Sequence, residues 1–232
     1  MKVEELAAHY IQEMQTLQPE GPYFLAGHSF GGLIAFEMAQ QLYKQGQKVA
    51  LLVLFDTFHK TSVKRISWNK RAYDHLDNVF KNGFDYLLQK IIGKIKWTSN
   101  QLKRKRQSRE STLYIASRIT VSAEEANTLE QHANKIASSN YVPQTYPGKV
   151  TLFKSKITSD RIAPEGWYVD PSLGWEELVG GGLEVYEISG DHHSMFREPN
   201  VQVLVDKLRI CIDKALDDDR EDYNPEPNDG GG

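Results

Sequence analysis

A serine set between two glycines is the feature of this sequence best suited to chemistry. The stretch Gly-His-Ser-Phe-Gly has the spacing G-x-S-x-G, after a short apolar run at residues 23–26 and before a helix-forming run at residues 30–45. That context predicts a nucleophile elbow, a sharp turn from a buried strand into a helix that projects the hydroxyl of Ser29 towards a base. We expect Gly27 and Gly31 to be required because larger side chains would collide in so tight a turn.

A serine hydroxyl needs an imidazole to take its proton and a carboxylate to hold that imidazole. Residues 49–55 form an unbroken apolar run, typical of a parallel strand buried on both faces, and Asp56 follows directly. A second strand-like run at residues 183–188 leads into a loop that carries His192. Because open α/β sheets build their sites at the carboxyl ends of the strands, we predict that Ser29, Asp56 and His192 meet there.

Both partners of the serine have competitors in the sequence. His193 adjoins His192, but Gly190 permits a tight approach two residues before His192 and favours that residue. Asp160 follows a later predicted strand, where many related sheets place the acid, but it lies in a polar loop in which solvation is the ordinary explanation. Asp56 abuts its strand directly, and we therefore predict Asp56 as the acid and His192 as the base.

The neighbours of these residues have other expected roles. His28, one residue before the serine, is expected to be positional rather than catalytic, and Asp191 is interpreted as a turn residue. The backbone N–H of Phe30 is expected to donate to the negative oxygen of a tetrahedral intermediate, as one half of an oxyanion hole. The helix that begins at Phe30 also points its positive end at this site.

The second donor of an oxyanion hole usually comes from a loop that follows an early strand, upstream of the elbow. The residues before Ser29 indicate one helix, at residues 3–17, and one strand. We therefore expect an N-terminally truncated fold without the oxyanion loop, either as a fragment of a longer polypeptide or with compromised hydrolysis. Losing one such donor lowers the rate by about 10²–10³.

The elements that must position these residues alternate between helix and strand. Strand-like residues 148–153 and a last helix at about residues 200–216 complete the pattern, which predicts an α/β fold with a mostly parallel sheet and helices on both faces. Residues 59–145 interrupt it with helical, aromatic-rich runs, one of them at residues 123–138, and we interpret them as a helical lid insertion; the alternative is extra helices of the fold. The predicted domains are a core at residues 1–58 and 146–216, the lid at 59–145, and an acidic disordered tail at 217–232.

The composition is that of an ordinary soluble globular chain, with 232 residues, 40% hydrophobic and 25% charged residues, and a net charge of −3. The single cysteine, Cys211, excludes an internal disulfide framework and most cysteine-based metal sites, and its apolar surroundings predict core packing. Neither a secretory signal nor an eighteen-residue apolar run occurs, so we expect a cytoplasmic protein without a membrane segment.

Basic residues gather in one part of the sequence. Residues 60–110 hold fourteen of the 28 lysine and arginine residues, including the run Lys103 to Arg106, against four acidic residues. We interpret this patch as a solvated surface, with docking of an acidic protein as the alternative, and we expect no nucleic-acid partner because no nucleic-acid-binding motif accompanies it.

Taken together, the motifs resemble those of a known family, the type I thioesterase domains of nonribosomal peptide and polyketide synthases, which belong to the α/β-hydrolase superfamily. The resemblance covers about residues 3–216. It is carried by these stretches: Val-Glu-Glu-Leu-Ala-Ala-His-Tyr-Ile at 3–11, Gln-Pro-Glu-Gly-Pro-Tyr at 18–23, Gly-His-Ser-Phe-Gly-Gly at 27–32, Asp56, Tyr-Pro-Gly-Lys-Val-Thr-Leu-Phe at 146–153, and Gly-Asp-His-His-Ser-Met at 190–195.

The resemblance implies an α/β-hydrolase-like fold and supports Asp56 and His192, because the family places its acid after the strand that follows the elbow helix and its histidine in a Gly-x-His-x-x-Met-like loop. It also implies a substrate, an acyl or peptidyl chain in thioester linkage to the 4'-phosphopantetheine of a carrier protein. Ser29 would take the acyl group, and water or an internal nucleophile would release an acid or a ring. The domain itself is expected to bind no cofactor and no metal.

Two other functions remain as alternatives at this point. One is a catalytically impaired remnant that keeps the fold and a carrier-docking role. The other is a free-standing esterase or editing thioesterase.

Overall fold

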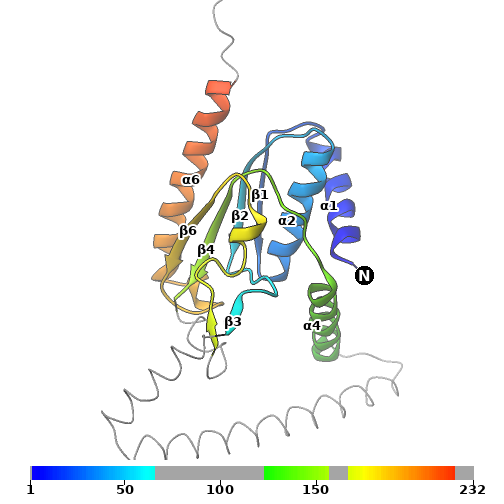
Figure 1. Ribbon diagram of the computed structural model, residues 1–232, viewed down its shortest axis with the longest axis vertical. Coiled ribbons are helices and arrows are strands. Elements are labelled where there is room, and N and C mark those ends of the chain that lie inside the picture. Colours follow the sequence, from blue (N-terminus) through cyan, green and yellow to red (C-terminus); the bar gives the residue numbers. More distant parts are fainter. Residues whose placement is uncertain (1, 66–122, 157–166, 223–232) are drawn as a thin grey trace, which may run out of the picture. The chain divides into compact units, whose positions relative to one another are not determined.

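The computed structural model describes residues 2–65, 123–156 and 167–222 (Figure 1). The chain divides into two compact units, one formed by Met1–Lys64 and Asn134–Gly232 and the other by Arg65–Ala133. Most of the expected lid at residues 59–145, its basic patch included, lies outside the described residues. The sheet, its covering helices and the candidate site all belong to the first unit.

Four parallel strands form the sheet, in the order β1-β2-β4-β6. They are β1 (Tyr23–His28), β2 (Val49–Phe55), β4 (Val150–Ser155) and β6 (Leu183–Ile188). In the register, His28 lies opposite Phe55, Phe55 opposite Phe153, and Ser155 opposite Ile188. The carboxyl ends of all four strands therefore lie at one edge of the sheet, as the alternating pattern predicts.

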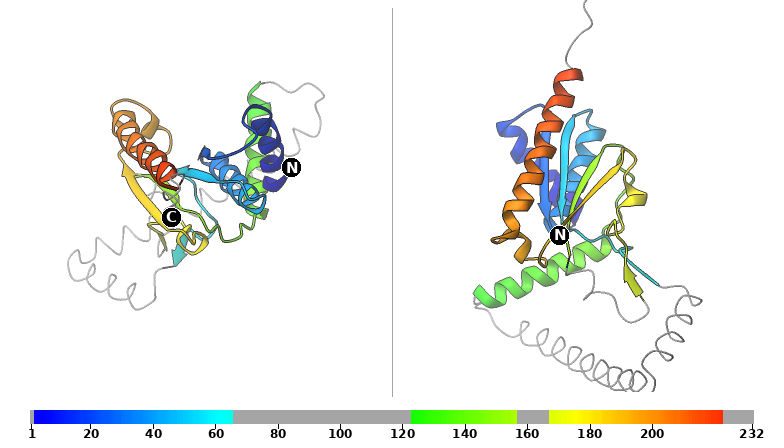
Figure 2. Two further views of the ribbon diagram at one scale, coloured as in Figure 1. Left: turned by 90° about the horizontal axis from the view of Figure 1, so that it is seen from above. Right: turned by 90° about the vertical axis from the view of Figure 1, so that its left-hand side faces the viewer.

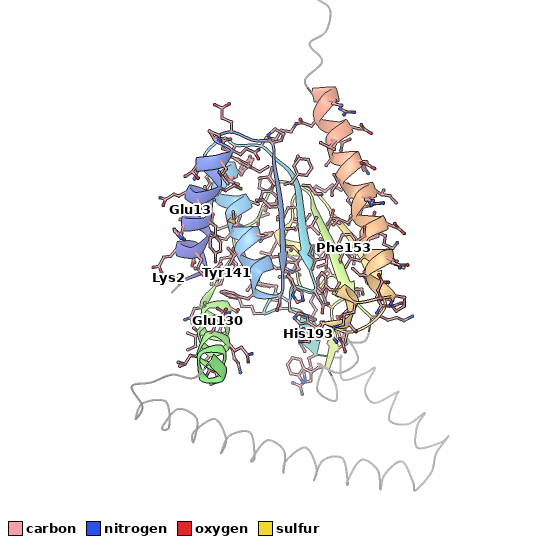
Figure 3. The ribbon with its side chains drawn as sticks, turned by 180° about the vertical axis from the view of Figure 1, so that it is seen from behind. Lys2, Glu13, Glu130, Tyr141, Phe153 and His193 are labelled. Carbon is pink, nitrogen blue, oxygen red and sulfur yellow. The ribbon has the colours of Figure 1, made fainter. Side chains whose placement is uncertain are left out.

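Helices cover both faces of this sheet (Figures 1 and 2). They are α1 (Val3–Leu17) and α2 (Phe30–Lys44) on one face and α6 (Asn200–Asp222) on the other. Because successive strand residues point to opposite faces, Leu52 and Leu54 pack in the core cluster of α1 and α2, whereas Phe55 and Phe153 pack with Leu204 of α6. Figure 3 shows Phe153 between the sheet and α6. The predicted α/β fold with two covered faces is confirmed.

Helix α6 continues past the end that the sequence predicts for it. It reaches Asp222 rather than residue 216, so the first part of the expected disordered tail is helical. Apolar periodicity ends near Leu216, but charge pairing accompanies the extra turns: the ammonium of Lys48 lies 2.7 Å from Asp219, and Arg220 lies 3.4 Å from Asp217. Residues 223–232 lie outside the described residues.

The remaining elements are short or lie near the insertion. Helix α4 (Ala123–Asn140) agrees with the helical run predicted at residues 123–138. Strands β3 (Val63–Arg65) and β5 (Trp167–Val169) form a separate two-stranded sheet that the sequence does not predict, because three residues are too few to show a period. Across the described ranges, no helix combines the length and the apolar character needed to span a bilayer.

Candidate active site

Ser29 occupies the turn between β1 and α2 in a conformation that few residues adopt. Its backbone has φ 55° and ψ −118°, outside the regions that non-glycine residues usually populate. Two hydrogen bonds hold the turn, from the N–H of Ser29 to the carbonyl of Phe55 at 3.0 Å and from the N–H of Gly32 to the carbonyl of Ser29 at 3.1 Å. The strand-to-helix elbow predicted from the sequence is present, with its backbone strained at the serine.

Two glycines of the elbow leave no room for a side chain, but only one of them is a glycine that the sequence predicts to be tight. A Cβ at Gly27 would lie 2.2 Å from the carbonyl oxygen of Gly31, so the need for glycine at 27 is confirmed. The same expectation for Gly31 is wrong, since a Cβ built there would meet no described atom within 4 Å beyond its chain neighbours and the backbone of its own helix. The tight position is Gly32, where a Cβ would lie 1.9 Å from the hydroxyl of Thr57. Only the packing of the β2 loop under α2 reveals this contact.

Asp56 follows β2 and is almost completely buried, with 1% of its surface exposed. Its carboxylate accepts hydrogen bonds from the N–H and the hydroxyl of Ser155, both at 2.8 Å, and from Nδ1 of His192 at 2.7 Å. Burial raises the pKa of the Asp56 carboxyl, but the hydrogen bonds from His192 and Ser155 outweigh it and hold that pKa below its usual value. Asp56 is therefore an ionised acceptor for His192 at neutral pH.

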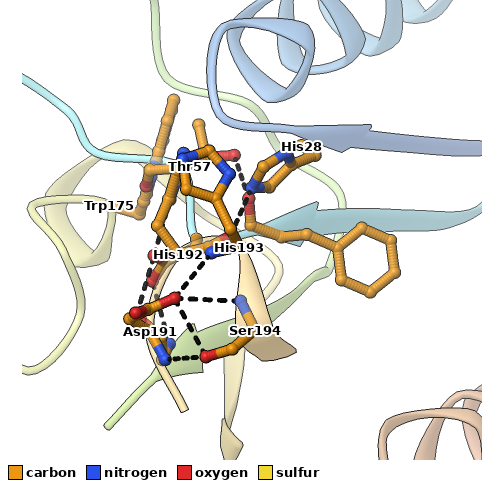
Figure 4. Close-up of polar contacts among 10 residues, drawn as sticks. His28, Thr57, Trp175, Asp191, His192, His193 and Ser194 are labelled. Carbon is orange, nitrogen blue, oxygen red and sulfur yellow. Dashed lines mark hydrogen bonds and ion pairs between the residues drawn. The ribbon is translucent and has the colours of Figure 1, made fainter. Parts of the chain in front are cut away.

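His192 lies in the loop after β6, in a turn that its neighbours shape. Gly190 has φ 97°, and a Cβ there would lie 2.7 Å from the hydroxyl of Ser194. The Oδ1 atom of Asp191 accepts hydrogen bonds from the N–H groups of His193 and Ser194 and from the Ser194 hydroxyl, at 2.9 to 3.1 Å (Figure 4). Hydrogen bonds from Ser194 and then His193 lower the pKa of Asp191 to about 2, as suits an acceptor within a turn.

The structure brings the predicted acid and base together at the carboxyl edge of the sheet. His192, rather than its exposed neighbour His193, contacts Asp56. The base also reaches the elbow, because the ring of His28, the residue before Ser29, lies 4.3 Å from the ring of His192. The competing acid Asp160 lies outside the described residues.

Two further residues support this edge. Ser155, at the end of β4, makes two of the hydrogen bonds to Asp56, and nothing in the sequence marks it because it is a lone serine at the end of an apolar run. The fully buried Trp175 donates from Nε1 to the carbonyl of Thr57 at 2.7 Å and so holds the loop that follows Asp56. Phe30 is the first residue of α2, where the positive end of the helix dipole lies.

The described part of the chain contains no group of three or more histidine, cysteine or acidic residues arranged to hold a metal ion. Cys211 is buried between α6 and the sheet, as its apolar surroundings predict.

The thioesterase domain family matches residues 1–209 of the chain. The chain is 28% identical over 211 residues to a dimodular nonribosomal peptide synthase of Bacillus subtilis (strain 168). The aligned segment covers 87% of this chain and 8% of that protein. It is 26% identical over 216 residues to the non-reducing polyketide synthase ntnG of Nectria sp. In that case the aligned segment covers 91% of this chain and 10% of that protein. The chain therefore spans about a tenth or less of the length of these relatives.

Solved structures agree with the fold. The thioesterase domain of NocB, in a covalent complex with a fluorophosphonate nocardicin G analog, matches with a TM-score of 0.56 at 23% identity, over 91% of this chain and 75% of that chain. The four-domain nonribosomal peptide synthetase AB3403 matches with a TM-score of 0.54 at 26% identity, over 89% of this chain and 16% of that chain. The predicted resemblance is confirmed.

Proposed function

Because the chain belongs to the thioesterase domain family, we propose that it releases an acyl or peptidyl chain from the 4'-phosphopantetheine thioester of a carrier protein, with Ser29 as the nucleophile. The observation that carries this proposal is the 2.7 Å contact between Asp56 and His192 at the strand ends, beside the strained turn of Ser29. Serine, acid and histidine in that chain order are the groups that acyl transfer through an acyl-serine requires.

In the first step, Nε2 of His192 takes the proton of Ser29 while the serine Oγ attacks the thioester carbon. Because Asp56 accepts the hydrogen bond from Nδ1 of His192, the other ring nitrogen keeps its lone pair for that proton. The tetrahedral intermediate then collapses: its carbon–sulfur bond breaks and the sulfur leaves with the proton that His192 returns. The acyl chain is left as an ester on Ser29.

In the second step, water or a hydroxyl or amine of the acyl chain attacks the ester carbon. His192 takes the proton of the attacking group and passes it to the Oγ of Ser29 as the ester bond breaks. Water gives an acid, and an internal nucleophile gives a ring. We assign the N–H of Phe30 as a donor to the oxyanion in both steps, a contribution of about 10²–10³ in rate for one such donor.

The carrier protein is the partner that the relatives support, since their names describe nonribosomal peptide and polyketide synthases. We also propose that residues 1–58 and 146–216 are the core and that residues 59–145 are a helical lid insertion. The acyl group would then meet Ser29 at the carboxyl edge of the sheet, where parallel sheets hold their ligands.

Labelling with a fluorophosphonate probe tests the proposal at its central atom. The thioesterase domain of NocB forms a covalent complex with a fluorophosphonate analog, so the probe suits this family. We expect one covalent adduct on Ser29 by intact-mass and peptide mass spectrometry, and none in Ser29→Ala. A wild-type chain that is folded by circular dichroism yet unlabelled would contradict the proposal and support an impaired remnant.

Substrate preference separates the remaining alternative. We expect acyl-pantetheine thioesters to be turned over with a higher kcat/KM than p-nitrophenyl esters of the same acyl chain. The reverse preference would support a free-standing esterase instead.

A further inference from the structure

His28 is the last residue of β1 and directly precedes the candidate nucleophile. Its half-buried ring contacts two other rings. Its centroid lies 4.3 Å from that of His192, at an interplanar angle of 35°, and 4.8 Å from that of Phe196, at 75°. Its Nε2 atom lies 3.1 Å from the backbone carbonyl oxygen of His192 (Figure 4). The residue before the nucleophile thus touches both the backbone and the side chain of the base.

The carbonyl contact defines the proton position on His28. A carbonyl oxygen only accepts, so Nε2 of His28 must carry the hydrogen and donate it. Because the elbow itself is held through the N–H of Ser29 and the carbonyl of Phe55, this bond ties the base loop to the same frame that holds the nucleophile.

The other restraints on His192 come from different directions. Asp56 holds Nδ1 of the ring, and Asp191 and Ser194 shape the turn from within the loop itself. Asp56 links the imidazole to the elbow indirectly, through the neighbouring Phe55, whose carbonyl accepts from the N–H of Ser29. His28 adds a direct contact from the elbow strand itself, because one peptide bond separates it from Ser29.

The electrostatic surroundings favour a neutral His28. The titratable groups that act on it are His192, Asp56 and His193. Burial and then the neighbouring charge of His192 lower the pKa of His28, and the opposing effects of the His192 carbonyl and Asp56 are smaller. A neutral ring with its hydrogen on Nε2 fits the contact with the His192 carbonyl.

We propose that His28 is a positioning residue that fixes the His192 imidazole relative to Ser29 through a tilted ring contact and a backbone hydrogen bond. The inference rests on the proposed function for its effect on rate. The effect of the contact on the orientation of His192 is a separate prediction, and it does not depend on the substrate.

Three substitutions separate the effect of the ring contact from the effect of the backbone hydrogen bond. His28→Phe keeps an aromatic ring and loses the donor, His28→Gln keeps a donor and loses the ring, and His28→Ala loses both. We expect kcat and the fluorophosphonate labelling rate to fall about 10-fold in each of the first two and about 100-fold in His28→Ala, with KM little changed, because the loss is one of alignment. The matched control is His9→Gln, an exposed histidine of α1, which should behave as wild type.

An independent measurement reads the orientation of His192. In ¹⁵N-histidine NMR, the Nδ1–H of His192 bonded to Asp56 should give one sharp signal in the wild type and in His9→Gln. In His28→Ala the signal should broaden or exchange faster with water, while thermal unfolding shows a folded chain. This readout needs no substrate.

The outcomes separate the two proposals. An unlabelled, folded wild type would contradict the proposed function, and the NMR comparison would still decide the role of His28. Normal labelling together with unchanged kcat, KM and His192 signal in His28→Ala would overturn the positioning role alone. A parallel loss of folding and rate in all three variants, with an unaltered His192 signal in the folded fraction, would also overturn it.

Discussion

Two buried carboxylates of the core, Asp56 and Glu37, show what separates the proposed catalytic acid from a structural group. Their exposed fractions are only 1% and 6%. Asp56 faces His192, whereas Glu37, in the middle of α2, accepts hydrogen bonds from the hydroxyl of Tyr141 and from the amide of Gln41, both at 2.8 Å. Burial and several donors are common to both sites, so neither property identifies the reactive one.

The difference lies in what each partner can do with a proton. His192 has a second ring nitrogen, so a carboxylate that orients Nδ1 leaves Nε2 for the proton exchange with Ser29 that we propose. Tyr141 has one hydroxyl, which is already bonded to Glu37. Burial and then the charge of Glu37 raise the pKa of Tyr141 well above its usual value, which keeps it a permanent donor. Tyr141 thus has no proton to release at neutral pH.

The two sites also differ in place. Asp56 lies at the carboxyl edge of the sheet, where β1, β2, β4 and β6 all end. Tyr141 follows α4, and its bond to Glu37 ties that segment to α2. Figure 3 labels His193 near the ends of the strands and Tyr141 near the beginning of α2. The comparison predicts that equivalent substitutions will affect rate at one site and stability at the other.

The largest effect is expected for Asp56→Asn. An amide in place of the carboxylate no longer favours the Nδ1–H form of His192 or stabilises its charged form, so the fluorophosphonate labelling rate and kcat should fall by about 10⁴. The matched control is Glu37→Gln, the same change of carboxylate to amide in the other buried site, and its rate should stay close to wild type. A normal rate in Asp56→Asn together with a loss in Asp160→Asn would show that the acid is assigned wrongly.

The next effect concerns stability. Tyr141→Phe removes one donor from the buried Glu37, and we expect the free energy of unfolding to fall by about 2–3 kcal/mol, since a hydrogen bond to a charged group is lost without replacement. Urea unfolding followed by circular dichroism measures it. The labelling rate of the folded protein should not change. A large loss of rate at full stability would erase the distinction between the two carboxylates.

The sequence predicts the location of the proposed catalytic residues better than that of the Glu37 site. Ser29 and Asp56 can be placed at the sheet edge because each directly follows a strand, and His192 because the loop that carries it follows a third. Tyr141 and Glu37 are more than a hundred residues apart and belong to no motif, so only the packing of α2 against the segment after α4 joins them.

The features that the sequence does not predict depend on contacts between distant segments. Gly32 rather than Gly31 is the tight position because Thr57 packs beneath it. Helix α6 continues beyond the last residue of its apolar pattern, and there Asp219 is paired with Lys48, the residue before β2. Neither contact leaves a local period or spacing from which it could be inferred.

The smallest effect is expected for Ser155→Ala, which weakens the support of Asp56 without removing it. The hydroxyl bond to Oδ2 is lost, but the backbone N–H of residue 155 and Nδ1 of His192 still bond the carboxylate. We expect a loss of about 1 kcal/mol in the free energy of unfolding at pH 7, by urea unfolding, and a modest loss of rate.

The same substitution tests the charge of Asp56 through pH. The pKa of Asp56 is lowered in the folded state, so in acid the unfolded chain binds more protons than the folded chain. The contribution of Asp56 to the free energy of unfolding is therefore fully present well above the ordinary carboxyl pKa of about 4, and it is lost as the pH falls through the lower folded pKa.

Without the Ser155 hydroxyl, the pKa of Asp56 in the folded state moves back up towards the ordinary value. The stability difference between wild type and Ser155→Ala should therefore shrink only as the pH falls below about 4, through the folded pKa of the variant and towards the lower folded pKa of the wild type. If this stability difference instead stayed constant down to the pH of acid unfolding, the Ser155 hydroxyl would not act through the ionised carboxylate. Asp56 would then be a structural carboxylate like Glu37.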